Sequence, residues 1–208
     1  MKKIVLATGN RGKILEIKEA LRGFSVALLT LEDFPGLEMP PEDGSSFEEN
    51  ALIKARYVMK ETGIAALADD SGLVVDILSG APGIHSARYA GVSATDGENI
   101  DKLLKELDGI LDDKRKASFI CALALVEPIP GGEGGPTEKI FTGMVDGVIL
   151  TERRGANGFG YDPVFYIPKL ERTTAELTDS EKLSVSHRGK AIEKFKEWVL
   201  RDFVEEGD

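Results

Sequence analysis

The chain has 208 residues, of which 42% are hydrophobic, so it can bury a substantial core, and we expect a single domain over residues 1–208. Its formal net charge is −10 and it has no block of lysine or arginine, which disfavours binding to a nucleic-acid polymer but not to a small anion. No apolar run reaches the roughly 18 residues of a membrane span, and a single cysteine, Cys121, excludes a disulfide framework. We therefore expect a cytoplasmic protein with no signal peptide and no membrane contact.

The N-terminal segment has the layout of an anion site. It predicts a strand over residues 3–7, a polar turn over residues 8–13 and a helix from about residue 13 to residue 21. This layout points backbone N–H groups and the N-terminus of a helix toward an anion, and Lys13 adds a point charge. The spacing is not that of a Walker A loop, and an ordinary polar turn is the alternative interpretation.

A strand over residues 25–31 and a loop over residues 34–44 lead to the next predicted helix. Serine and glutamate occur twice at capping-box spacing, Ser45 to Glu48 and Ser46 to Glu49. We expect the helix to begin there and to run to about residue 62, where a glycine ends it.

Polar residues around this helix are candidates for a site. Asn50 and Lys54 are four residues apart and share one face, where neighbouring alanines allow the close approach of another element. A surface polar pair is the alternative. The acids Glu42 and Asp43 lie in the preceding loop, where they are either solvated or, for one of them, near a metal.

The stretch from residue 64 to residue 75 has the most informative pattern in the sequence. Apolar residues lead into two adjacent carboxylates, Asp69 and Asp70, and are followed by Ser71, a glycine and further apolar residues. The apolar run predicts a buried strand with the acidic pair at its end. Because unpaired charge is expensive to bury, a divalent cation and an anionic substrate would offset that cost. An acidic turn is the alternative, and the chain beyond it either pairs back as a hairpin or continues.

Residues 80–150 are expected to form mainly structural elements. A glycine-punctuated loop over residues 80–91 carries Arg88, which either reaches a phosphate or pins the loop to an acid. We expect a helix over residues 95–107 and a central strand, buried on both faces, over residues 117–126. A hairpin loop over residues 130–136 precedes two returning strands over residues 139–142 and 145–150, the second of which is interrupted near Asp146 and Gly147.

A glycine-rich segment over residues 155–166 lets the backbone approach a ligand closely. Phe159 and Tyr161 offer flat faces for a base, and Asp162 is held extended by the proline that follows it. The alternative is a turn before a strand, with the aromatic rings in the core.

The C-terminal segment predicts two helices. A capping box from Thr178 to Glu181 starts a short helix that carries Lys182. Ser186 can cap the last helix, which places His187 and Arg188 at its positive end, where they either meet an acceptor-rich ligand or are solvated.

Six segments, in one order along the chain, resemble a single protein family. They are Thr8-Gly9-Asn10-x-x-Lys13, Phe47-x-Glu49-Asn50-Ala51-x-x-Lys54-Ala55, Ala68-Asp69-Asp70-Ser71-Gly72-Leu73, Pro82-Gly83-x-x-Ser86-Ala87-Arg88, Gly158-Phe159-Gly160-Tyr161-Asp162-Pro163 and Ser186-His187-Arg188-Gly189-Lys190-Ala191. Together they are similar to the inosine triphosphate pyrophosphatase family, also called XTP/dITP diphosphatase, from about Lys3 to Phe195.

This resemblance implies a two-lobed α/β fold with an elongated central mixed sheet flanked by helices and an active site in the cleft between the lobes. It implies a homodimer that uses Mg²⁺ to hydrolyse deaminated purine nucleoside triphosphates (ITP, dITP and XTP) to the monophosphate and pyrophosphate. Such an activity cleans the nucleotide pool.

The resemblance also implies roles for individual residues. Asp70 would bind Mg²⁺ and orient or deprotonate the attacking water, and Asp69 would support it. The second metal ligand would be a loop glutamate, for which Glu42 is our choice and Glu38 the alternative. The substrate-binding residues would be Thr8, Gly9, Asn10, Arg11, Gly12, Lys13 and Lys54 at the triphosphate, Ser71 and Arg88 as further contacts, and Phe159, Gly160, Tyr161, Asp162, Lys182, His187 and Arg188 at the base.

Two other functions remain open on the sequence. One is a pyrophosphatase of the related Maf type, which acts on pyrimidine or modified nucleotides. The other is a nucleotide sensor without turnover, which the acidic pair beside an anion site makes less favourable.

Overall fold

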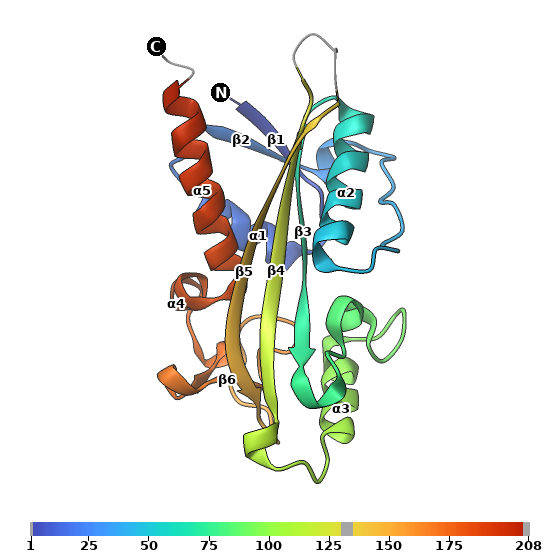
Figure 1. Ribbon diagram of the computed structural model, residues 1–208, viewed down its shortest axis with the longest axis vertical. Helices are drawn as coiled ribbons and strands as arrows, with labels where there is room; N and C mark the ends of the chain where they lie inside the picture. The colour runs from blue at the N-terminus through green and yellow to red at the C-terminus, as the bar shows by residue number, and fades with distance from the viewer. Residues whose placement is uncertain (1, 130–134, 206–208) are drawn as a thin grey trace. The chain divides into compact units, whose positions relative to one another are not determined.

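The computed structural model describes residues 2–129 and 135–205, which form a mixed sheet with helices (Figure 1). Within these residues the sheet has seven strands in the order β2-β1-β3-β4-β5-β6-β7. The strands are β1 (Lys2–Leu6), β2 (Val26–Thr30), β3 (Ala65–Val75), β4 (Lys116–Glu127), β5 (Thr137–Ile149), β6 (Phe165–Ile167) and β7 (Arg172–Thr173). The α-helices are α1 (Arg11–Ala20), α2 (Phe47–Thr62), α3 (Asp96–Glu106), α4 (Asp179–Val185) and α5 (His187–Glu205).

The predicted elements are confirmed in type and order, except that the two returning strands predicted over residues 139–142 and 145–150 form the single strand β5. The expected α/β class with a mixed sheet is confirmed. β4 is the middle strand of the sheet, as its apolar sequence predicted. Most of the expected hairpin loop at 130–136 lies outside the described residues. Among the helices that the structure describes, none is long and apolar enough to span a membrane.

The chain divides into two compact units. Unit 1 is built from Met1–Asp70, Cys121–Thr142 and Lys190–Asp208, and unit 2 from Ser71–Ile120 and Gly143–Gly189. The strands β3, β4 and β5 each contribute residues to both units. The boundary therefore runs through covalently continuous strands, and on β3 it falls between Asp70 and Ser71.

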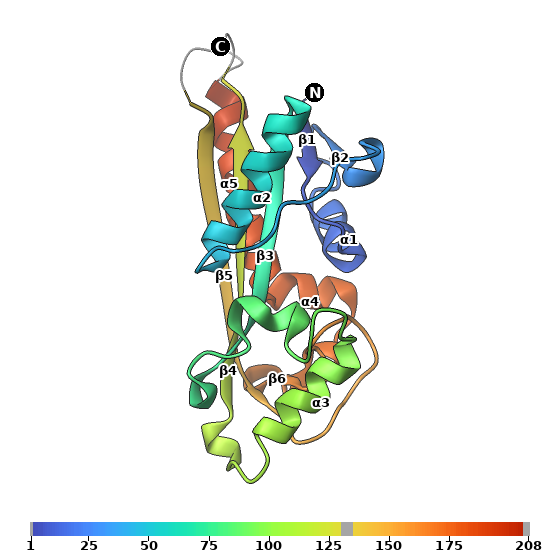
Figure 2. The same cartoon turned by 90° about the vertical axis from the view of Figure 1, so that its right-hand side faces the viewer.

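In unit 1, helices cover both faces of the strands. Figures 1 and 2 show α2 against one face and α5 against the other. The buried face of α2 contains Ala51 and Ala55, both without exposed surface, and these small side chains let the helix lie close to the sheet. The buried hydrophobic residues of α5 are Ala191, Ile192, Phe195, Trp198 and Val199, which recur at helical spacing.

The start of α2 corrects one detail of the sequence analysis. Ser46 is the N-cap and accepts a hydrogen bond from the N–H of Glu49 at 3.2 Å. The carboxylate of Glu49 accepts the N–H and the hydroxyl of Ser45, both at 2.7 Å. The predicted pairing of Ser45 with Glu48 is therefore wrong, because both serines use the same glutamate. The helix ends as predicted, at Gly63 with a left-handed φ of 68°.

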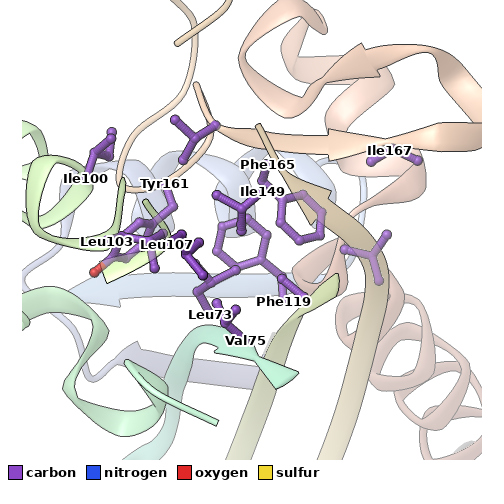
Figure 3. Close-up of a cluster of buried hydrophobic side chains, with 13 residues drawn as sticks. Leu73, Val75, Ile100, Leu103, Leu107, Phe119, Ile149, Tyr161, Phe165 and Ile167 are labelled. Atoms are coloured by element: carbon purple, nitrogen blue, oxygen red, sulfur yellow. The ribbon is translucent and has the colours of Figure 1, made fainter. Parts of the chain in front are cut away.

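Unit 2 has its own hydrophobic core, shown in Figure 3. Side chains from the C-terminal part of β3, from α3 and from β4, β5 and β6 meet in it, and the labelled residues include Leu73, Leu103, Phe119, Ile149 and Phe165. The rings of Phe119 and Phe165 pack with centroids 4.5 Å apart. This core fixes the segment after Leu150, which carries the residues expected at the base.

The returning strand contains no interruption, and the predicted break near Asp146 and Gly147 is wrong. β5 is continuous from Thr137 to Ile149. Gly147 is required by close approach rather than by a turn, since a Cβ there would lie 2.5 Å from the carbonyl oxygen of Tyr166 on the neighbouring β6.

Candidate active site

The parallel pairing of β1 with β3 places the N-terminal turn beside the acidic pair. Leu6 is in register with Leu67, and the N–H of Ala7 donates to the carbonyl oxygen of Leu67 at 2.9 Å. The next residues on each strand are the turn after β1 and the Ala68–Asp70 segment of β3. The ammonium group of Lys13 forms an ion pair with Asp69 Oδ1. The two segments on which the sequence argument depends are therefore in direct contact.

The turn itself is held by local hydrogen bonds. Asn10 is the N-cap of α1, and its Oδ1 accepts the N–H of Lys13 at 3.1 Å. The N–H of Asn10 donates to Thr8 Oγ1 at 3.2 Å. Gly9, Asn10 and Arg11 are exposed, whereas Thr8 is buried. This conformation leaves the turn on the surface with the N-terminus of α1 behind it.

The acidic pair lies inside β3 and not at its end. The strand runs without a turn from Ala65 to Val75, so both the predicted strand end and the alternative acidic turn are wrong. Successive side chains of a strand point to opposite faces. Asp69 accordingly contacts Lys13 of α1 on one face, and Asp70 contacts Lys54 of α2 on the other. The buried carboxylates are tolerated in the strand because each has a lysine from a covering helix.

Asp69 has a further partner that sequence reasoning missed. The thiol of Cys121 on β4 donates to Asp69 Oδ2 at 3.0 Å, and both residues are fully buried. The sequence shows Cys121 only as a single cysteine within an apolar run. The signal was its place in a strand buried on both faces, but the pairing partner depends on β3 and β4 being neighbours in the sheet.

Lys54 joins three groups of unit 1. Its Nζ lies 2.7 Å from Glu42 Oε1, 2.8 Å from the carbonyl oxygen of Asp69 and 3.4 Å from Asp70 Oδ1. Burial alone would lower the pKa of Lys54, but the nearby charges of Asp70, Glu42 and Asp69 outweigh it and the pKa is raised. Lys54 is therefore a buried ammonium group, and the alternative of a surface pair with Asn50 is wrong.

Asp70 is the least satisfied carboxylate of this cluster. It is 6% exposed, and burial raises its pKa although Lys54 and Lys13 favour the charged form. Its Oδ1 faces Lys54, whereas its buried Oδ2 has no hydrogen-bond partner. An unpaired buried acceptor of this kind is rare and calls for an explanation.

The donor set around Asp70 fits a magnesium ion. Among the described residues no three acidic, histidine or cysteine side chains group together as a metal cage. Mg²⁺ does not need one, because it is bound through one or two carboxylates, several waters and substrate phosphates. Asp70 and Glu42 supply two carboxylates, both next to Lys54. Glu38 is exposed, and no contact places it in this cluster.

Unit 2 contains a second buried lysine–carboxylate pair. Lys182 Nζ lies 2.6 Å from Asp162 Oδ2, and the same oxygen accepts the N–H of Phe159 at 2.9 Å. The other oxygen, Oδ1, accepts the hydroxyl of Thr174 at 2.8 Å. Asp162 therefore ties the glycine-rich segment to α4 and to the segment after β7.

Two cations lie over the ring of Phe159. Lys182 Nζ is 4.6 Å from the ring centroid, and the guanidinium carbon of Arg188 is 5.6 Å from it. Arg188 is only 1% exposed and donates through Nη2 to Ser71 Oγ at 2.8 Å. Ser71 follows Asp70 directly on β3, so this contact links the start of α5 to the strand that carries the acidic pair.

The other residues expected at the base occupy different positions in unit 2. His187 is buried and stacks on Phe119 with centroids 4.8 Å apart, so neither it nor Arg188 is solvated. Tyr161 is 4% exposed, belongs to the hydrophobic core in Figure 3, and donates its hydroxyl to the carbonyl oxygen of Ser86 at 2.9 Å. This is the location that the core alternative predicted. The N–H of Gly160 donates to Asp96 at 2.7 Å, and Arg88 is half-buried.

Known proteins are similar to nearly the whole chain. The model of the Ham1 family matches residues 4–198. A dITP/XTP pyrophosphatase from Bacillus cereus is 47% identical over 204 residues, which cover 96% of this chain and 98% of the relative. One from Vibrio parahaemolyticus is 50% identical over 192 residues, which cover 92% of this chain and 94% of the relative.

Solved structures show the same similarity. A HAM1 protein from Coxiella burnetii has a TM-score of 0.87 at 46% identity, covering 97% of this chain and all of that one. The Ham1 protein of Staphylococcus aureus has a TM-score of 0.80 at 39% identity, covering both chains in full. The family model and these relatives cover nearly the whole chain. The protein therefore belongs to the Ham1 family.

Proposed function

We propose that this chain is a dITP/XTP pyrophosphatase, which hydrolyses deaminated purine nucleoside triphosphates (ITP, dITP and XTP) to the monophosphate and pyrophosphate. Relatives of this name match more than nine-tenths of the chain at 47–50% identity. The structural observation that carries the proposal is the meeting of Lys13 and Lys54 with Asp69 and Asp70 on β3. Two adjacent carboxylates of one strand, each paired with an ammonium group, suit a polyphosphate and a divalent cation.

The lysines and the turn would hold the triphosphate. In the free protein each ammonium group is neutralised by a carboxylate of β3, which keeps both in place before the substrate arrives. Phosphate oxygens would then compete for the same donors, together with the N-terminus of α1 behind the turn formed by Thr8, Gly9, Asn10, Arg11 and Gly12.

Asp70 would orient the attacking water and accept its proton. Burial, by raising the pKa of this carboxyl, makes it a better proton acceptor than an exposed aspartate. Its free Oδ2 is available to a ligand, and Asp69 supports it from the opposite face of the strand. Asp70 and Glu42 would hold Mg²⁺, which supplies charge neutralisation for the pyrophosphate leaving group.

The residues around Phe159 would bind the base. Arg188, Lys182 and His187 are donors at the start of α5 and on α4, and a 6-oxo purine offers an acceptor at the position where adenine has an amino donor. A site with donors for an oxo group rejects adenine because those donors would lose their partner. Arg88 and Ser71 would add contacts from unit 2.

Three further features belong to the proposal on the strength of the family resemblance. The chain would work as one domain over residues 1–208, its lobes would hold the active site in a cleft, and it would be a homodimer. The dimer is checked by sedimentation equilibrium, in which a mass near twice the 22.5 kDa of the chain is expected.

The proposal is tested with a substrate panel and product identification. Incubation with dITP, XTP, dATP, dGTP, UTP and TTP and Mg²⁺ should give pyrophosphate from dITP and XTP with the highest kcat/KM. Orthophosphate as the first product would refute the reaction. A preference for UTP or TTP would favour the Maf-type alternative, and tight dITP binding without hydrolysis under any divalent metal would favour a sensor.

A further inference from the structure

Asn50 is a buried polar residue to which the reaction above gives no role. It lies on α2 one turn before Lys54 and has no exposed surface. Its Oδ1 accepts the N–H of Gly44 at 2.9 Å, while its Nδ2 has no hydrogen-bond partner. A buried amide with one unused donor is costly, because the group loses its bonds to water on folding.

The unused donor, Asn50 Nδ2, and the unused acceptor, Asp70 Oδ2, complement each other chemically. Asn50 lies one turn before Lys54 on the buried face of α2, and Lys54 Nζ is 3.4 Å from Asp70 Oδ1, so the Asn50 side chain is near this carboxylate. There it favours the charged form and acts against the raised pKa of Asp70. Nevertheless, neither Asn50 Nδ2 nor Asp70 Oδ2 has a partner at hydrogen-bonding distance. Complementary buried groups that are near each other and unpaired are typical of a site that tightens when its ligand is present.

Gly44 fixes which end of the amide faces Asp70. Its N–H selects the oxygen of Asn50, which leaves the Nδ2 donor for the carboxylate. The approach is close, since a Cβ on Gly44 would lie 2.8 Å from Asn50 Oδ1 and 2.8 Å from the Cβ of Glu49. Gly44 is also two residues after Glu42, so this hydrogen bond joins the loop of the second carboxylate to the helix beside Asp70.

We propose that Asn50 is a positioning residue for Asp70: oriented by the Gly44 N–H, it donates through Nδ2 to one lone pair of Asp70 Oδ2 in the substrate-loaded enzyme, and the second lone pair stays available to a ligand. The inference rests on the proposed function, in which Asp70 is both proton acceptor and metal ligand. Carboxylates that ligate a metal are themselves hydrogen-bonded, and loss of such a partner typically costs about 10- to 100-fold in metal affinity or activity.

The kinetic test uses two variants of Asn50 in the full chain. Asn50→Asp keeps the acceptor for Gly44 but replaces the donor that faces Asp70, and Asn50→Leu removes both at similar volume. Both should lower kcat for dITP by about 10- to 100-fold while KM stays within about three-fold, because the triphosphate contacts are untouched. A kcat within two-fold of the wild type, or an effect confined to KM, would overturn the inference.

Asn99 of α3 supplies a matched control. It is also buried, its Oδ1 accepts the N–H of Ala90 at 2.7 Å and its Nδ2 donates to the carbonyl oxygen of Ala87 at 3.3 Å. Asn99→Asp makes the same change in a buried amide that has no contact with the acidic pair. It should lower thermal stability but leave kcat unchanged. An equal fall of kcat in both Asp variants would mean that the loss at Asn50 is merely structural, and would overturn the inference.

A second readout does not need turnover. Binding of Mn²⁺, a spectroscopic substitute for Mg²⁺, is measured by calorimetry for the wild type and Asn50→Leu without nucleotide, and the variant should bind about 10-fold more weakly. Equal affinities would overturn the role of Asn50 even if dITP is hydrolysed as expected. Absence of Mn²⁺ binding by the wild type would overturn the assignment of Asp70 as a ligand, and this inference with it. If the wild type binds Mn²⁺ but releases no pyrophosphate from dITP, the proposed function fails and the calorimetry still decides the role of Asn50.

Discussion

Lys54 with Asp70 in unit 1 and Lys182 with Asp162 in unit 2 are both buried lysine–aspartate pairs, but the two carboxylates have different surroundings. Asp162 accepts hydrogen bonds from Lys182, from the N–H of Phe159 and from the hydroxyl of Thr174, so both its oxygens are satisfied. In the described part of the chain, Asp70 has Lys54 at 3.4 Å on Oδ1 and no hydrogen-bond partner on Oδ2, and burial raises its pKa. A buried carboxylate whose two oxygens both accept hydrogen bonds (a saturated carboxylate) stabilises the loop around it. An under-satisfied carboxylate has an oxygen that can still bind a ligand.

The largest effect is expected at the under-satisfied carboxylate. Asp70→Asn keeps the shape of the side chain but removes its charge and its capacity to accept a proton, so kcat for dITP should fall by about 10²- to 10⁴-fold. Lys54 keeps Glu42 and the Asp69 carbonyl oxygen as partners, so the fold should survive. Pyrophosphate release and thermal unfolding followed by circular dichroism measure both. A folded variant with near-normal kcat would show that Asp70 has no role in proton transfer.

Substitution of the saturated carboxylate, Asp162, should lower the stability of the fold. Asp162→Ala removes the carboxylate that pairs with the buried ammonium group of Lys182 and the acceptor of the Phe159 N–H, whereas the Thr174 hydroxyl keeps the Asp162 carbonyl oxygen. The free energy of unfolding should therefore fall by about 3–5 kcal/mol. Urea denaturation measures the loss. Thr174→Val, which removes a single donor, is the control and should cost about 1 kcal/mol. If Asp162→Ala unfolds no more easily than Thr174→Val, the buried pair is not what holds the loop.

Variants of Tyr161 and Phe159 distinguish which aromatic residue of the glycine-rich segment contacts the base. Its hydroxyl donates to the Ser86 carbonyl oxygen, so Tyr161→Phe should lower the free energy of unfolding by about 0.5–1.5 kcal/mol. The KM for dITP should remain within two-fold, in contrast to Phe159→Leu, which removes the ring beneath Lys182 and Arg188 and should raise KM. A several-fold rise of KM in Tyr161→Phe would instead put this hydroxyl at the substrate.

The smallest effect concerns an exposed carboxylate, that of Glu181. The backbone N–H of Thr178, Arg172 and the Thr178 hydroxyl lower the pKa of Glu181 to about 2 at the start of α4. A carboxyl whose pKa is lower in the folded than in the unfolded chain stabilises the fold above the unfolded pKa near 4.5 and loses that contribution as the pH falls toward 2. Between those pH values the thermal midpoint of the wild type should therefore fall slightly more steeply than that of Glu181→Gln. Parallel profiles would show that the cap adds nothing to global stability.

Local patterns predicted much of the fold because they depend on neighbouring residues. The capping residues Thr95, Thr178 and Ser186 and the glycine at 63 mark helix ends where the structure has them. Local sequence patterns gave wrong predictions where a residue distant in the chain determines the local structure. The acidic pair continues a strand because Lys13 and Lys54 neutralise it, and β5 passes through Gly147 because β6 lies against it.

By itself, the sequence determined the order and type of the elements, the buried faces of the helices and the identity of the family, since six spaced motifs and helical periodicity are properties of the chain. Only the tertiary structure decided that Asp69 and Asp70 face opposite sides of β3, that Cys121 and Asn50 lie beside them, and that Tyr161 belongs to the core. The physical reason is that burial and hydrogen-bond satisfaction are set by residues far apart in the chain, which meet only when the sheet is assembled.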